Sequence, residues 1–502
     1  MPCQHRFTDT ATICRITSAV FLAYNPIQPV KVNEDLLAFR EDCITRLLQF
    51  ISEIQYPLID ERKNFRKKMT HKMHTPHIKT LLIIFALTQG LSFNTFAQDD
   101  LEMTSKNPKK DCQVLVADRI FDGFSLFENV AILFKGNTII RVGDPNQFNG
   151  ICQHQIDLGD ATILPGFIES HSHLAIQNIP HEIVLKHGIT TARDTGGPLL
   201  KPTGGNGQLR VLSAGPIIQA VNGYPLNIFG QNEQDSHDQY GAVGVSVETV
   251  AEAEKVVEDL VAGGSSIIKI ALEPGGEIGA PWMSSHGHGE PPKTPWPLLS
   301  LDIVKAIVAK AHALKKRVAA HVGENIGVEL ALEAGVDEWA HIPCAEIRED
   351  LLHRAVAQGV TFITTIDMLS ACVGVHANTH KLAHIMANSS DTQSKFIYGS
   401  EIGHDNVPWG INGEEMALML HLTSGDAIDF MDVLNIFKAV TSEAGKNLGN
   451  PLLGTLSKDA PADIIAVRGN PFQRFKLLEY PDMVISGGRM IVNNFKKNKE
   501  NH

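Results

Sequence analysis

The sequence predicts an α/β fold in which parallel strands alternate with helices, and three observations lead to this class. After Pro165, apolar runs of strand length alternate with segments of helical periodicity, which is typical of parallel βα units. Eight such strand-like runs follow one another up to Glu401, as in a (β/α)8 barrel of the TIM type. Shorter β-type runs lie on both sides of this region, so we expect them to pack together as a small β-sandwich.

The N-terminal region has the pattern of a secretory signal peptide over residues 73–98. A basic flank precedes an apolar run that is too short for a comfortable membrane span, and small residues near Ala97/Gln98 resemble a cleavage site. We therefore expect residues 1–72 to be a mis-called or disordered extension. The mature chain is expected to be periplasmic or secreted, without a membrane span. The alternative is a genuine extension with an amphipathic helix over residues 34–55.

The β-type segments are expected to form the sandwich from residues 111–164 and 452–495. In both segments, runs of β-forming residues are separated by turn residues. These runs cover residues 113–118, 129–134, 138–142, 463–467 and 482–486.

The region over residues 165–451 contains the barrel elements. A first strand runs to His173, and the others are expected at residues 190–194, 210–213, 266–271, 317–321, 338–342, 360–365 and 396–401. The helix over residues 247–262 should end at Gly263-Gly264, because a left-handed cap favours glycine, and the helix over residues 301–316 should begin after the N-cap Ser300. Further helices are expected at residues 182–187, 326–333, 351–357, 415–422 and 430–439.

His171 and His173 end the first barrel strand. Residues two apart on a strand point to the same face, so both imidazoles would face one spot, as a metal site requires. An isolated HxH pair is often a surface accident, but barrels of this kind carry their chemistry at the C-terminal ends of the strands. Other ligand-type residues lie on or just after later strands: Lys269, His321, His341, Glu401 and Asp405.

Each of these later residues also has an interpretation without chemistry. A lone histidine at a strand end, such as His321 or His341, is more often a structural residue. Lys269 lies in an apolar run, and since a buried lysine is costly, a surface-facing position is the alternative. Glu401 could be a loop carboxylate. All of these alternatives would have to hold independently, which favours one convergent site.

Together these stretches resemble the amidohydrolase superfamily, nearest its imidazolonepropionase-like and prolidase-like branch. The resemblance covers about residues 112–490 and is carried by Leu164–His173, Gly188–Asp194, Ile267–Ile270, Ala320–Val322, Ala331–His341 and Gly454–Ile465. It implies a barrel, a β-sandwich and one or two divalent metal ions, usually Zn²⁺. It also implies that Lys269 is carboxylated by carbon dioxide and bridges two metals. The remaining metal ligands that it implies are His171, His173, His321, His341 and Glu401.

The sequence departs from the family pattern at the eighth strand, where Gly-Thr-Asp is replaced by Gly399-Ser400-Glu401. The resemblance implies that this carboxylate binds metal and moves the proton. A glutamate places its carboxylate about an ångström further along, which matters in a tightly held site. Either the backbone recedes, or Asp405 reaches in instead, or catalysis is impaired. Glu401 ranks first by register.

The function that the resemblance implies is hydrolysis of an amide C–N bond, in a dipeptide (prolidase-like) or a cyclic amide, by a metal-activated water. Candidate substrate contacts are Tyr224, His286 and His288, with solvated loop residues as the alternative. The competing hypothesis is a catalytically impaired relative that binds a ligand. A net charge of −12 disfavours nucleic acid, and a nucleic-acid deaminase would also need cysteine ligands that are not evident. We expect a homo-oligomer.

Overall fold

The computed structural model describes residues 112–229, 243–275 and 294–495, apart from 373, 391, 405 and 426. The predicted signal peptide and the residues before it lie outside this part, as do Asp405, His286 and His288. The described chain is a mixed α/β protein with parallel sheets, which confirms the predicted class. None of its helices combines the length and apolar character needed to cross a membrane.

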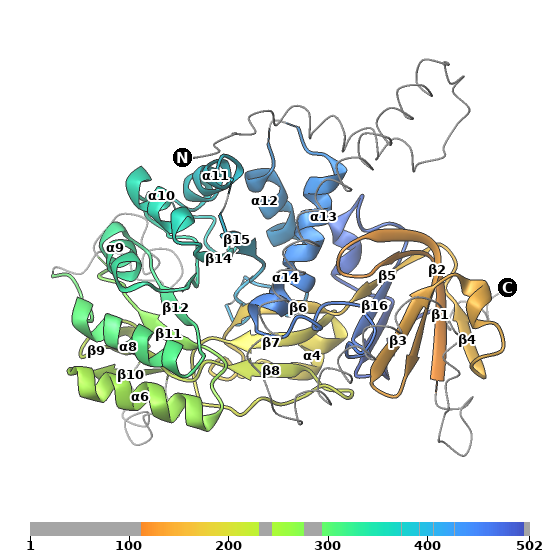
Figure 1. Ribbon diagram of the computed structural model, residues 1–502, viewed down its shortest axis with the longest axis horizontal. Coiled ribbons are helices and arrows are strands. Elements are labelled where there is room, and N and C mark those ends of the chain that lie inside the picture. Colours follow the sequence, from red (N-terminus) through yellow and green to blue (C-terminus); the bar gives the residue numbers. More distant parts are fainter. Residues whose placement is uncertain are drawn as a thin grey trace, which may run out of the picture. The chain divides into compact units, whose positions relative to one another are not determined.

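One eight-stranded sheet joins the two ends of the described chain (Figure 1). Its order is β18-β17-β16-β5-β1-β2-β3, and β4 pairs with β1. The antiparallel pairing of β16 with β5 connects the segments that precede and follow the parallel sheets. The strands are β1 (Cys112–Phe121), β2 (Leu126–Lys135), β3 (Thr138–Gly143), β4 (His154–Asp157), β5 (Ala161–Pro165), β16 (Ile464–Arg468), β17 (Met483–Ser486) and β18 (Arg489–Asn493).

Two parallel sheets contain the strands that the sequence predicts for the barrel. The first has the order β6-β7-β8, and the second the order β10-β9-β11-β12-β13-β14-β15. The short strands β9 and β10 were not predicted. The strands are β6 (Phe167–Ser172), β7 (Ile189–Asp194), β8 (Arg210–Ser213), β9 (Ile217–Ala220), β10 (Gly244–Val247), β11 (Ile268–Ala271), β12 (Val318–His321), β13 (Glu338–Trp339), β14 (Thr361–Ile363) and β15 (Lys395–Ile397).

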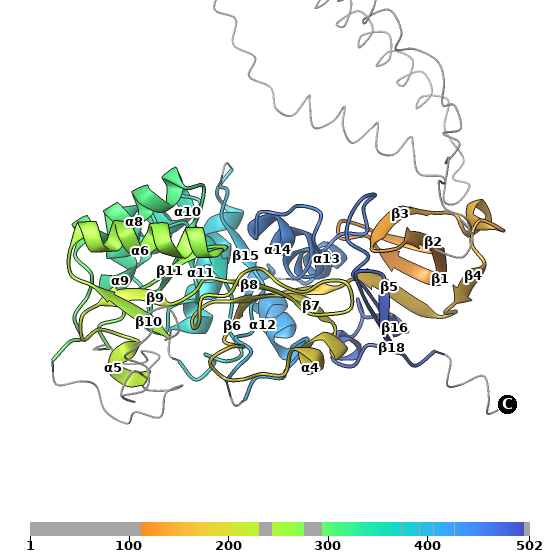
Figure 2. The same cartoon turned by 90° about the horizontal axis from the view of Figure 1, so that it is seen from below.

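Single hydrogen bonds, and not continuous ladders, connect the two parallel sheets. Ser266 N donates to Ser213 O (2.8 Å), next to β8 and β11. At the other edge, His173 N donates to Ile402 O (2.8 Å), and Ser172 forms a parallel bridge with Ile402. The strand pairing of the described residues therefore does not establish a closed barrel. In both ribbon views, β6, β7 and β8 lie between the helix-rich part and the eight-stranded sheet (Figures 1 and 2).

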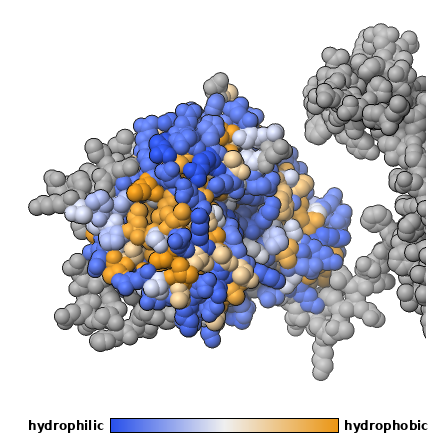
Figure 3. Space-filling view, turned by 60° about the vertical axis from the view of Figure 1, so that its left-hand side comes forward, coloured by the Kyte–Doolittle hydropathy of each residue, from blue (hydrophilic) through white to orange (hydrophobic). Residues whose placement is uncertain are grey.

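The helices that follow the parallel strands begin and end close to the predicted residues. In α6 (Val250–Gly263), Thr249 and Glu252 form a capping box, and Gly264 ends the helix with a φ of 110°. In α8 (Leu301–Ala313), Ser300 caps the N-terminus. The other predicted helices are α4 (His181–Lys186), α9 (Asn325–Ala334), α10 (Glu349–Ala357), α12 (Gly413–Thr423) and α13 (Phe430–Ala439). Three helices were not predicted: α5 (Leu226–Phe229), α11 (Val375–Ala387) and α14 (Ser442–Asn447). The surface on the side of α6, α8 and α9 is mainly hydrophilic, with one area where hydrophobic residues gather (Figure 3).

Helix α11 was not predicted, because part of its buried face is polar. Asn378 and Thr379 are fully buried beside Leu382 and Ile385. The amide of Asn378 donates to Pro343 O (2.9 Å) and Ala345 O (2.8 Å). This side chain therefore satisfies the backbone of the loop that follows β13, which an apolar residue could not do.

Two disulfides connect the four cysteines of the described chain. Cys112 in β1 is bonded to Cys152, and Cys344 is bonded to Cys372. The second bond joins the loop after β13 to the loop after β14. The spacing of the cysteines in the sequence does not reveal which of them meet in the fold.

Candidate metal centre

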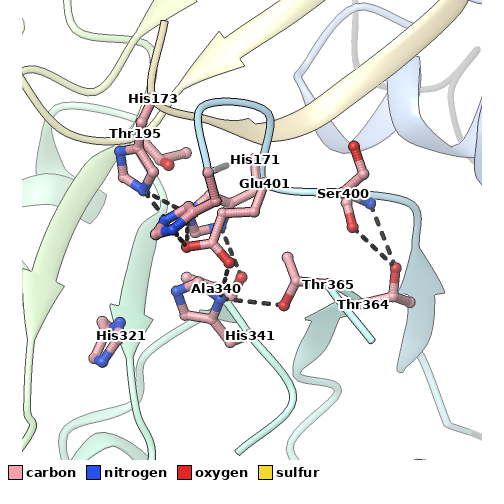
Figure 4. A network of polar contacts seen from close by, with 12 residues as sticks. His171, His173, Thr195, His321, Ala340, His341, Thr364, Thr365, Ser400 and Glu401 are labelled. Atoms are coloured by element: carbon pink, nitrogen blue, oxygen red, sulfur yellow. Dashed lines mark hydrogen bonds and ion pairs between the residues drawn. The ribbon is translucent and has the colours of Figure 1, made fainter. Parts of the chain in front are cut away.

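Three of the predicted histidines and Glu401 converge just past the ends of the parallel strands (Figure 4). Oε1 of Glu401 lies 4.0 Å from Nε2 of His171 and 3.7 Å from Nε2 of His173, and Oε2 lies 3.5 Å from Nδ1 of His341. His171 is in β6, whereas His173, His341 and Glu401 lie in loops beyond the strands. The sequence prediction that strands six and eight extend to residues 342 and 401 is wrong: β13 and β15 end earlier, and the chain turns towards the site.

His404 is a further imidazole in this cluster that sequence analysis did not select. Its Nε2 lies 3.3 Å from Oε1 of Glu401. Among the residues that the structure describes, two groups have ligand atoms within 4.8 Å of one another, and both contain Glu401. They are His171/His341/Glu401 and His173/Glu401/His404. The sequence could have indicated His404, because it directly precedes Asp405, which was considered as a candidate base.

His321 and Tyr224 lie beside this cluster and outside both ligand groups. The ring centre of His321, the last residue of β12, is 4.8 Å from that of His341 and 4.7 Å from that of Tyr224. Tyr224 in turn stacks on Trp296, with 5.9 Å between ring centres. Nε2 of His321 is 3.6 Å from Oε2 of Glu273. The structure therefore places the aromatic rings of Tyr224 and Trp296 next to the histidine cluster.

Lys269 is buried in β11, with 1% of its surface exposed, so the surface-facing alternative is wrong. No hydrogen bond or ion pair joins its side chain to another described residue, although its backbone lies in the ladder between β11 and β12. Burial lowers the pKa of Lys269 to about 7, against the opposing effect of Glu401. Its charge also lowers the pKa of four histidines, which indicates that its side chain faces the same interior; these are His171, His173, His321 and His341.

Burial lowers the pKa of the imidazoles of His171, His173, His321 and His341. It lowers the pKa of His321 to about 3 and holds the pKa of His171 and His341 well below the usual value. Burial acts to raise the pKa of Glu401, but its interactions with His341 and His404, together with hydrogen bonds from His173 and His404, hold this pKa well below its usual range. The lowered pKa values of His171, His321 and His341 favour the neutral imidazole, which is the form of histidine that binds metals.

The donor set fits a divalent cation. Within the described chain, Oε2 of Glu401 and Nε2 of His321 are buried without a hydrogen-bond partner, a state that costs free energy unless a partner binds. Nε2 of His171 and Nε2 of His173 face each other at 3.4 Å. Nδ1 of His171 donates to Ala340 O (2.8 Å), which leaves its Nε2 lone pair for a metal. Imidazole nitrogen and carboxylate oxygen are ligands that Zn²⁺ prefers.

Two residues of the site have a left-handed backbone. Glu401 has a φ of 66° and Thr365 a φ of 46°. Such values are rare for non-glycine residues, above all for β-branched ones, and cluster at functional sites. Oγ1 of Thr365 lies 3.1 Å from Nδ1 of His341. At Glu401 the backbone turns, and the glutamate carboxylate lies among the histidines although its side chain is one methylene longer than that of an aspartate.

Glu169 connects β6 to the loop that carries Glu401. It is fully buried, and its carboxylate accepts hydrogen bonds from His171 N (2.8 Å), Ser400 N (3.0 Å) and Ser400 Oγ (2.7 Å). His171 is a candidate metal ligand, and Ser400 directly precedes Glu401. Glu169 therefore fixes the two ends of the site relative to each other. Sequence analysis did not select it, because its partner lies more than two hundred residues away.

A buried ion pair lies below the cluster. The guanidinium of Arg193 in β7 pairs with the carboxylate of Glu338 in β13, and its Nε donates to Ser170 O (2.9 Å). Arg317 also lies 3.6 Å from Glu338. Since Ser170 directly precedes His171, this network links three parallel strands just beneath the histidines.

Comparisons with known proteins give similarity at the level of the fold. No protein-family model matches the chain. Ochratoxinase of Aspergillus niger is 24% identical over 311 residues, which cover 59% of this chain and 58% of that relative. A solved Xaa-Pro dipeptidase has a TM-score of 0.60 at 21% identity, covering 76% of this chain and 99% of that one. The A. niger ochratoxinase structure has a TM-score of 0.58 at 18% identity, covering 76% and 96%.

The chain therefore shares the fold of amidohydrolase-superfamily proteins, which confirms the resemblance indicated by the sequence. Among individual proteins, it is similar to a Xaa-Pro dipeptidase and to an ochratoxinase. The match to the curated ochratoxinase spans less than two thirds of that protein's length.

Proposed function

We propose that the protein is a metal-dependent hydrolase that cleaves an amide C–N bond. The observation that carries this proposal is the position of Glu401 among His171, His173 and His341. Lys269 is buried, and its charge acts on the same histidines. The names of its structural neighbours, a Xaa-Pro dipeptidase and an ochratoxinase, support hydrolysis as the reaction class.

One or two divalent metal ions, most simply Zn²⁺, would be held by these residues together with His321. Lys269 is suited to carboxylation, because an amine with a pKa of about 7 is partly unprotonated at neutral pH and can attack carbon dioxide. The new Nζ–C bond would form with loss of a proton, giving an anion that would compensate the positive charge of the divalent metal ions. A bound divalent metal ion lowers the pKa of water and polarises a carbonyl.

Glu401 is the proposed proton carrier. Its carboxylate is ionised at neutral pH, so it can take a proton from the attacking water and deliver it to the leaving nitrogen. Asp405 is the alternative base. Tyr224 is the proposed substrate contact, and the neighbouring Trp296 favours a substrate with an apolar side chain, either a dipeptide or a cyclic amide.

A second candidate function is binding without catalysis, and the replacement of the family's aspartate by Glu401 favours it. Against it, the longer carboxylate is not displaced from the site, since it lies within 4.0 Å of four imidazoles. The hydrolase is therefore the better supported of the two.

We also propose that the parallel strands close into a (β/α)8 barrel over residues 165–451, with the flanking segments as a separate β domain. The hydrogen bonds at both edges of the two parallel sheets support closure. Export to the periplasm or the exterior is supported by the two disulfides, which are typical of oxidising compartments. Assembly into a homo-oligomer remains a prediction.

The test is a screen of zinc-loaded protein against dipeptides, including those with proline, and against lactams. The hydrolase proposal expects turnover of at least one amide and a loss of about 100-fold or more in kcat for Glu401→Gln. If no amide is cleaved by wild type but Glu401→Asp acquires activity, the protein is an impaired relative.

A further inference from the structure

Helix α11 carries three histidines at intervals of four residues. They are His376, His380 and His384, and all three are exposed. At 100° per residue, successive members are offset by about 40° around the helix axis, so they form one stripe. The buried residues of the helix, among them Asn378 and Leu382, lie on the opposite face. The stripe therefore faces solvent.

The spacing suits chelation of a metal ion by neighbouring pairs. Residues four apart on a helix have Cβ atoms about 5–6 Å apart, so two imidazoles can reach one ion at the usual metal–nitrogen distance of about 2 Å. His376 and His384 are two turns apart and about 12 Å along the axis, so they cannot share an ion directly. His380 belongs to both possible pairs.

Small residues flank the stripe on the helix itself. Ala383 and Ala387 lie beside it on the helix, and neither is large enough to cover an imidazole. The two pairs are not equivalent, because the side-chain nitrogen of Asn388 lies 3.4 Å from Nε2 of His384 and engages that ring nitrogen in a hydrogen bond. The pair of His376 and His380 is the less encumbered of the two.

We propose that α11 binds one divalent transition-metal ion at its surface, between His380 and a histidine one turn away, with His376 as the preferred partner. Imidazole ligands suit Zn²⁺, Ni²⁺ and Cu²⁺, and water completes the coordination. This site is separate from the buried cluster around Glu401 and does not depend on the proposed hydrolysis.

The test uses the full-length protein, loaded with zinc and freed of excess metal, and titrates it with Ni²⁺ by calorimetry at neutral pH. Elemental analysis before and after the titration shows whether the bound zinc is retained. His380→Ala should lose one Ni²⁺ equivalent relative to wild type. His384→Ala should change little, His376→Ala should weaken binding, and the double variant His376→Ala/His384→Ala should match His380→Ala.

A matched control is His421→Ala, an exposed histidine on α12 without a histidine one turn away. It should bind as much Ni²⁺ as wild type, and all variants should keep their melting curves because the side chains are exposed. The proposal is overturned if His380→Ala binds as much Ni²⁺ as wild type, or if the control loses the same equivalent.

Discussion

Glu401 combines a buried carboxylate with a left-handed backbone. The residue is 5% exposed, and its carboxylate lies within 4.0 Å of four imidazoles, which come from β6 and from the loops after β6, β13 and β15. Its left-handed backbone is one that aspartate and asparagine adopt more readily than most residues. The extra methylene of Glu401 therefore extends the carboxylate towards the histidines, but it does not make the left-handed backbone more favourable.

We expect Glu401→Asp to fold and to bind metal less tightly than wild type. The shorter side chain withdraws the carboxylate by about an ångström from imidazoles that stay in place. Metal dissociation followed with a chromogenic chelator measures the change. A variant that binds metal more tightly and turns over faster would show that Glu401 is a detrimental substitution.

The buried histidines predict how acid affects folding. In the folded chain the pKa of His321 is lowered from 6.5 to about 3, so the unfolded chain binds more protons than the folded chain between these values. The free energy of unfolding contributed by this residue must therefore fall as the pH drops below about 6.5. Buried carboxyl groups such as Glu169 and Glu415, whose pKa is raised by burial, act in the opposite direction.

A comparison with His321→Asn isolates this effect. From about pH 7 to about pH 4, the urea midpoint of metal-free wild type should fall by more than that of the variant. Equal changes in the two midpoints would mean that His321 is not held neutral by burial.

Glu169 offers a test of positioning that does not touch the proposed ligands. Glu169→Gln leaves at least one buried donor of His171 or Ser400 without an acceptor, at a cost of about 1–3 kcal/mol. Because these donors hold both ends of the site, metal affinity should fall as well. Chemical denaturation and metal titration measure the two effects, with the exposed Glu346→Gln as control. If Glu169→Gln is less stable but binds metal as tightly as wild type, Glu169 stabilises the fold and does not position the metal ligands.

At the scale of elements, the ion pair of Arg193 and Glu338 ties β7 to β13 under the site. Arg193→Met would leave a buried carboxylate with only Arg317, at 3.6 Å, as a cationic partner. Removing one member of a buried pair costs about 3–5 kcal/mol, so we expect a clear drop in the denaturation midpoint. Arg193→Met/Glu338→Gln should recover part of it. A double variant as unstable as the single one would contradict this account.

Much of the parallel core could be predicted from the sequence because its strands are short, apolar and bounded by turn residues. His171, His173 and Lys269 followed from strand periodicity and from the rule that chemistry lies at strand ends. The missed features depend on contacts between distant segments. Glu169 bonds to Ser400, Asn378 caps a loop before its own helix, and His404 meets His173 only after the chain has turned at Glu401.

For the whole molecule, the central claim is that residues from β6, β11, β12 and the loops after β13 and β15 gather around divalent metal. The fold alone does not establish this, since proteins with one fold host different chemistries. The claim rests on buried neutral imidazoles, an ionised carboxylate and a buried lysine that faces them.

The most direct measurement is the metal content of the purified protein, determined by elemental analysis for wild type, His171→Ala and Lys269→Met. The account predicts one or two tightly held divalent ions per wild-type chain, and a loss of at least one in each variant while the fold is retained by circular dichroism. A wild-type chain that holds no divalent ion after reconstitution, or variants that hold as much as wild type, would contradict it.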